Sequence, residues 1–203
     1  MRIRNRGEER RFFPFFILWI LIGWIGGFAH WAGLNPAGGA QSAELSAFDR
    51  LAEEATQLNR KGLYDQVIAL LEPRKGDPRN DSALFFNELG IAYRNRGKYA
   101  EAIEAYRMGL QRDPENPVLM KNLGDAYILQ QAYSQAIEQL QKALKGNPRF
   151  HQAHFSLGVA YYRMGKYPEA LEAFERVLQL SPGDGQAQRF RAEIQKKLKS
   201  SPR

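Results

Sequence analysis

The residue types that most often carry chemistry are scarce in this sequence. Its 203 residues include no cysteine, which excludes a thiol nucleophile, an iron–sulfur cluster and a disulfide scaffold. Only three histidines are present, and two of them, His151 and His154, stand one helical turn apart, where they could offer two ligands to a metal ion. No further histidine or acidic residue follows at ligand spacing. We therefore expect no metal site.

The motifs of the common enzyme classes are also missing. The sequence has no Walker loop, no nucleophile elbow and no dinucleotide-binding glycine pattern. Its carboxylates alternate with Lys and Arg as on solvated helix faces, and none is placed for acid–base catalysis. We expect a protein without enzymatic activity or cofactor. Asn80-Asp81-Ser82 is formally a glycosylation sequon, but a helix cap is its expected role.

An uncharged segment covers residues 12–43, and its first part, residues 12–32, is apolar and aromatic. As a helix these residues would span about 31 Å, close to the thickness of a bilayer's hydrocarbon core. The head, residues 1–11, holds five Arg against two Glu, and the next basic residue after the segment is Arg50. The positive-inside rule then predicts a single-pass membrane helix with a cytoplasmic amino terminus. The rest of the chain would lie on the periplasmic or lumenal side.

Other interpretations of this segment remain open. A secretory signal could be cleaved near Gly38 and Ala40, which would release a soluble exported protein. Arg10-Arg11 resembles a twin-arginine export signal in a poorly matching context. A buried helix of a soluble core is disfavoured, because no later segment is apolar enough to surround it. Residues 33–47, rich in Gly, Ala, Ser and Pro, are predicted to form a flexible linker.

The remainder of the chain is an internal repeat. A proline, a Leu-Gly pair and a tyrosine each recur every 34 residues: Pro114, Pro148 and Pro182; Leu89-Gly90, Leu123-Gly124 and Leu157-Gly158; Tyr93, Tyr127 and Tyr161. Within each period, apolar residues fall at helical spacing in two runs separated by a short turn. A period of this length predicts stacked helix pairs, none of which buries its apolar face alone.

Each period resembles a tetratricopeptide repeat. The repeats cover residues 83–116, 117–150 and 151–184, and their large, Leu-Gly, Tyr, Ala and Pro positions are nearly all filled. Gly109 departs from the usual alanine. The resemblance implies an all-α fold, a right-handed superhelix preceded here by the transmembrane helix.

Two flanking units are less regular. Residues 48–82 resemble a degenerate repeat, since Gly62-Leu63-Tyr64 matches the inter-helix turn while Glu54-Ala55 replaces the Leu-Gly pair. Residues 185–203 resemble a cap helix with a basic tail. On that helix Ala187, Phe190, Ile194 and Leu198 are expected to form the apolar face.

The resemblance also implies a concave groove that binds a segment of a partner protein. The candidate groove residues, carried over position by position, are Leu84, Asn87, Ile91, Arg94, Asn95, Val118, Lys121, Asn122, Asp125, Ile128, Leu129, Gln152, Phe155, Val159, Tyr162 and Arg163. Their aliphatic, aromatic and polar mixture suits an extended or helical protein segment. Such a scaffold would assist assembly of a membrane or envelope complex.

One specific activity of such repeats is not expected. Co-chaperones of this family grip the acidic carboxyl terminus of heat-shock chaperones with Lys, Arg and Asn side chains. The corresponding residues here are Asn87, Ile91, Asn122, Gln152 and Ser156. Only Asn122 matches, and without cations to receive a carboxylate this binding mode is disfavoured.

The net charge of +7 is concentrated at the two ends of the chain. Residues 49–184 hold 18 basic and 18 acidic residues, so the repeat region is neutral and offers no footprint for a nucleic acid. We expect a protein partner and a membrane contact through residues 12–32. The sequence leaves the partner's identity and the oligomeric state open.

Overall fold

The computed structural model describes residues 36–200. The chain divides into two units, Met1–Gln41 and Ser42–Arg203, and the packing described below is that of the second. The predicted basic head and membrane helix, residues 1–11 and 12–32, lie outside the described residues. Between residues 36 and 200, no helix combines the length and the apolar character needed to cross a bilayer.

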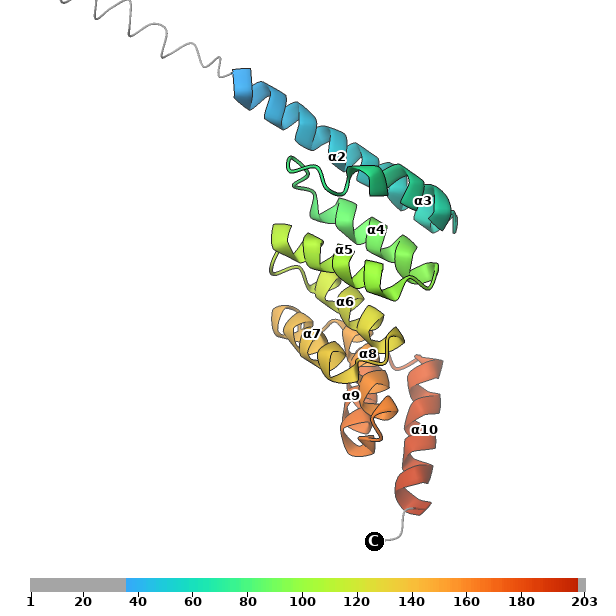
Figure 1. Ribbon diagram of the computed structural model, residues 1–203. Coiled ribbons are helices and arrows are strands. Elements are labelled where there is room, and N and C mark those ends of the chain that lie inside the picture. Colours follow the sequence, from blue (N-terminus) through green and yellow to red (C-terminus); the bar gives the residue numbers. More distant parts are fainter. Residues whose placement is uncertain (1–35, 201–203) are drawn as a thin grey trace, which may run out of the picture. The chain divides into compact units, whose positions relative to one another are not determined.

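The regular elements of the described residues are all helices, with no strand among them, and turns or short loops connect them. The elements are α2 (Pro36–Arg60), α3 (Tyr64–Leu71), a short 3-10 helix η1 (Glu72–Arg74), α4 (Ala83–Asn95), α5 (Tyr99–Arg112), α6 (Pro117–Leu129), α7 (Tyr133–Gly146), α8 (His151–Arg163), α9 (Tyr167–Leu180) and α10 (Gly185–Ser200). In Figure 1 they follow one another as a stack, each pair lying on the preceding one. Neighbours in sequence are therefore neighbours in space, as expected for a repeat array.

Close helix crossings hold each pair together. In every regular unit the glycine of the Leu-Gly pair meets a large side chain of the second helix: Gly90 with Tyr106, Gly124 with Leu140, and Gly158 with Phe174. A Cβ atom on Gly90 would lie 2.5 Å from the Tyr106 ring. Only glycine permits this approach, which explains why the position recurs in all three units.

The turn between paired helices needs a left-handed residue. Gly62, Gly97 and Gly165 adopt φ values of 74°, 76° and 73° at this place, and Gln131 adopts 64° in the middle regular unit. Glycine takes this conformation without steric strain, whereas glutamine does not. The turn geometry is thus kept even where its preferred residue is missing.

Polar side chains cap the beginnings of α4 and α6. The Ser82 hydroxyl accepts a hydrogen bond from the Phe85 N–H, and the Asn116 side chain accepts from the N–H groups of Val118 and Leu119. Asn80 is fully buried, and its Oδ1 accepts from the Ser82 N–H. The sequon is therefore part of a helix-capping turn, and its Asn side chain is inaccessible to a glycan.

Two expectations need correction. The predicted linker, residues 33–47, is helical from Pro36 onward, because α2 begins there. Proline suits the first position of a helix, and Ala43, Glu44 and Leu45 have high helix propensity, whereas Gly38 and Gly39 do not favour the helix. On α10, Ala187 and Ile194 are buried as expected, but Leu198 is 40% exposed because the helix end extends past the last pair.

Candidate functional site

The first helices of successive units, α2, α4, α6 and α8, carry the candidate groove residues or lie beside them. Most of these residues are accessible to solvent. Exposed members are Leu84, Asn95, Val118, Leu129, Gln152 and Arg163; partly exposed ones are Asn87, Ile91, Arg94, Lys121, Asp125, Ile128, Phe155, Val159 and Tyr162. Asn122 alone among them is buried. We call this surface, together with the adjoining face of α2, the groove.

A chain of hydrogen bonds runs between neighbouring helices of the groove. Asn59 on α2 donates to the Glu88 carboxylate on α4 at 2.8 Å, and Asn87 donates to the other oxygen of that carboxylate at 3.1 Å. Asn122 on α6 then donates to Asn87 at 2.8 Å. Three successive helices are thereby joined through side-chain amides and one buried carboxylate.

The chain continues through Asp125. Lys121 donates to Asn122 and forms an ion pair with Asp125 at 3.1 Å, while Arg94 approaches the same carboxylate at 3.5 Å. Ser156 on α8 donates to Asp125 at 2.6 Å. The polar network therefore extends from α2 to α8, and Asp125 is its charge-compensated centre.

Apolar side chains stand exposed beside this network. Leu84 is 42% exposed, and Val118 and Leu129 are each 47% exposed. Leu84 and Val118 occupy equivalent positions on α4 and α6, where both line a hollow of about 250 Å³. Exposed aliphatic residues next to a fixed polar framework can bury the apolar side of an incoming segment.

The groove residues of the last unit are partly covered by the cap helix. Phe155 and Tyr162 make edge contacts with Phe190 of α10, at ring-centroid distances of 5.9 and 5.4 Å. The Tyr162 hydroxyl donates a short hydrogen bond to Glu193, and this bond, together with burial, raises the pKa of Tyr162. These two side chains therefore engage α10, and the groove is most open over α2, α4 and α6.

The contribution of α2 to the groove was not anticipated. A second hollow, of about 610 Å³, lies between α2 and α4, with Gln57 and Arg60 on one side and Leu84 and Glu88 on the other. Glu54-Ala55 stands in α2 where a regular repeat has Leu-Gly. Without that pair α2 could not be aligned with the other repeats, so no groove position was assigned to it. The turn Gly62-Leu63-Tyr64 is the one signal that could have supplied the register.

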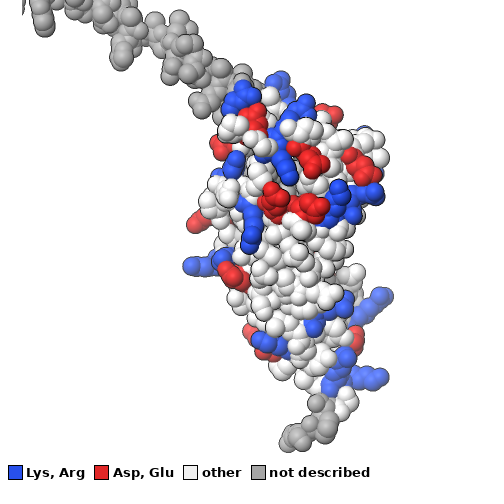
Figure 2. Space-filling model, viewed as in Figure 1, with Lys and Arg blue, Asp and Glu red and all other residues white. Residues whose placement is uncertain are grey.

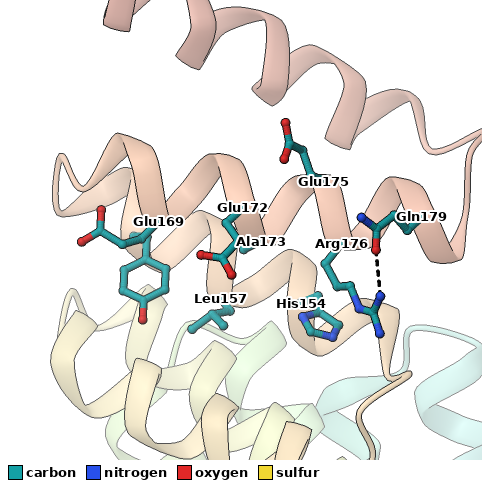
Figure 3. A pocket seen from close by; sticks show the side chains of 9 residues that line it. His154, Leu157, Glu169, Glu172, Ala173, Glu175, Arg176 and Gln179 are labelled. Carbon is teal, nitrogen blue, oxygen red and sulfur yellow. Dashed lines mark hydrogen bonds between the residues drawn. The ribbon is translucent and has the colours of Figure 1, made fainter.

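A further pocket lies between α8 and α9, with a volume of about 490 Å³. His154 lines it with Leu157, Glu169 and Glu172, and Glu175 points away from the imidazole (Figure 3). The His154 Nε2 atom lies 3.0 Å from the Pro148 carbonyl oxygen. No group of three or more His, Asp or Glu residues between positions 36 and 200 is arranged to hold a metal ion.

Several known proteins resemble this chain. A segment of 61 residues is 44% identical to RNA polymerase II-associated protein 3 of Rattus norvegicus, covering 29% of this chain and 9% of that protein. The first tetratricopeptide domain of Spaghetti (RPAP3), bound to the HSP90 peptide SRMEEVD, is 34% identical with a TM-score of 0.58, over 59% of this chain and 94% of that one. MamA AMB-1 is 27% identical with a TM-score of 0.63, over 75% of this chain and 82% of that one.

The curated relatives are much longer proteins, since the matched segment spans about a tenth of their length. The sequence pattern of the tetratricopeptide repeat itself matches residues 45–117, 87–148 and 121–185, which together cover most of the chain. The helix pairs, their glycine crossings and their superhelical stacking agree with this pattern. The chain belongs to the tetratricopeptide repeat family.

Proposed function

We propose that this chain is a non-enzymatic interaction scaffold that binds a segment of a partner protein in the groove. The observation that carries the proposal is the row of exposed aliphatic residues, Leu84, Val118 and Leu129, beside a polar network that is already hydrogen-bonded. A prearranged framework loses little entropy on binding, and the aliphatic side chains gain from burial. The peptide bound to the related domain of Spaghetti supports a peptide segment, in general, as the ligand.

The acidic peptide of that relative is not the ligand we propose. Asn87 and Asn122 hydrogen-bond to each other, and Ser156 donates to Asp125, so these positions are engaged within the chain. Ile91 and Gln152 carry no charge. Arg94 and Lys121 lie near these positions in the described part of the chain, but both already pair with Asp125 and do not offer a free charge to a terminal carboxylate.

We further propose that residues 12–32 hold the scaffold in a membrane, with the amino terminus in the cytoplasm and the repeats on the periplasmic or lumenal side. The uncharged apolar segment and the arginine-rich head support this orientation. In this position the groove would assist assembly of a membrane or envelope complex. Cleavage near residue 40, giving an exported soluble protein, is the alternative.

Selection of peptides from a random display library against the detergent-solubilised full chain tests the groove. Val118→Asp should weaken binding of a selected peptide at least about tenfold, because a charge replaces an apolar contact. Leu198→Asp is the matched control, since Leu198 is similarly exposed but lies on α10. The SRMEEVD peptide should show no saturable binding.

Equal losses in both variants would place the peptide outside the groove. Saturable binding of SRMEEVD would instead favour the chaperone-tail function. Either result would overturn this part of the proposal.

A further inference from the structure

The hollow between α2 and α4 has an unusual carboxylate in its wall. Glu88 is only 5% exposed, yet it lines this space of about 610 Å³. Its two oxygens accept from the amides of Asn59 and Asn87. Among the described residues, no Lys or Arg nitrogen lies within ion-pairing distance of it.

Asp125 provides the comparison within the same network. Its carboxylate forms ion pairs with Lys121 and Arg94 and accepts a hydrogen bond from the Ser156 hydroxyl, so two cations compensate its charge. Glu88 accepts hydrogen bonds only from neutral amides, which orient the carboxylate but bring no opposite charge to it. A buried carboxylate that is hydrogen-bonded but has no counterion is less favourable than one in an ion pair, and an incoming cation would supply that counterion.

The surroundings of Glu88 suit a long basic side chain. Leu84, which is 42% exposed, adds an apolar wall along which a methylene stem can lie. Glu53 and Glu54 line the same hollow, so its carboxylates outnumber the guanidinium groups of Arg50 and Arg60. On the face seen in Figure 2, acidic and basic side chains crowd the end of the array around α2 and α4 and thin out over the middle.

We propose that this hollow is a subsite for a Lys or Arg side chain of the bound segment, whose cationic end pairs with Glu88. This proposal rests on the proposed function, because the bound partner segment supplies that basic side chain. The chemistry also applies to an isolated arginine derivative, so the subsite can be tested without knowing the partner.

The experiment is an NMR titration of the isotope-labelled full chain in neutral detergent. N-acetyl-arginine amide should shift the side-chain amide signals of Asn59 and Asn87 in a saturable manner, because both donate to Glu88. N-acetyl-citrulline amide, of the same shape but uncharged, should bind at least about tenfold more weakly. Glu88→Gln should abolish the preference for arginine, while Glu172→Gln, an exposed change on α9, should keep it.

Equal responses to the two compounds, or an arginine preference that survives Glu88→Gln, would overturn the subsite. Thermal unfolding monitors whether Glu88→Gln still folds; if it does not, the comparison of the two compounds on the unmodified chain decides alone. If the chain binds display-selected peptides but does not bind the arginine derivative, only the subsite is contradicted. If the chain prefers the arginine derivative but no peptide is selected from the library, only the proposed function is contradicted.

Discussion

At Gly124, helices α6 and α7 cross so closely that a single methyl group matters. A Cβ atom there would lie 2.7 Å from Leu140 Cγ and 3.4 Å from the Ala136 carbonyl oxygen. Gly124→Ala should lower the free energy of unfolding by about 1–3 kcal/mol, because the overlap outweighs alanine's better helix propensity. Gly146→Ala, on α7 with open space around it, should be neutral or stabilising. Urea unfolding that found the two variants alike would contradict the crossing.

Tyr106 should make the free energy of unfolding decrease at alkaline pH. Burial raises its pKa above the usual value near 10, and its hydroxyl has no hydrogen-bond partner among the described residues. The folded state therefore keeps a proton that the unfolded state releases. The free energy of unfolding should therefore keep its full value below about pH 10 and should decline as the pH rises toward the folded-state pKa.

Tyr106→Phe should consequently be neutral or stabilising at pH 7 and should reduce the loss of stability above pH 10. Burial also raises the pKa of Tyr93, so part of the alkaline loss should remain. The measurement is the unfolding free energy between neutral and strongly alkaline pH. A variant with the unmodified chain's full alkaline decline would show that Tyr106 is not the group responsible.

At the scale of the element, α10 packs on the last helix pair through the buried Ala187 and Ile194 and through the aromatic ring of Phe190. Phe190 stacks on Phe174 with a centroid distance of 4.7 Å and an interplanar angle of 3°. Phe190→Ala should destabilise the chain by about 2–4 kcal/mol, less than a fully buried phenylalanine would because Phe190 is partly exposed. Leu198→Ala should change little, since Leu198 makes up the exposed end of α10. Thermal unfolding of both variants checks this, and equal stability would mean that α10 does not pack as described.

Local signals made the helix pairs predictable, whereas contacts between distant residues were not. The spacing of Leu-Gly, Tyr and Pro marks each pair because every crossing repeats the same contact, as at Gly90 and Gly158. The hydrogen bond between Asn122 and Asn87 joins two units, and its existence depends on how they stack. The covering of Tyr162 by α10 likewise depends on the rotation of the cap helix, which composition does not determine.

At the scale of the whole molecule, the two ends carry the positive charge and the repeats carry none overall. If residues 12–32 form a membrane helix, the chain should stay in the membrane fraction after a high-salt wash, since salt screens surface charge but not apolar burial. Deletion of residues 12–32 should release it. A mature soluble chain that begins near residue 40, found by amino-terminal sequencing, would favour cleavage instead.

The central claim is that the groove receives a partner segment, and site-specific photo-crosslinking in intact cells tests it most directly. A photoreactive residue at Val118 should yield a discrete adduct of one partner, and the same adduct should form from Leu84, because both positions line one hollow. A photoreactive residue at Glu172, on the exposed surface of α9, should not yield it. Adducts of equal strength from Glu172, or none from Val118 and Leu84, would contradict the account.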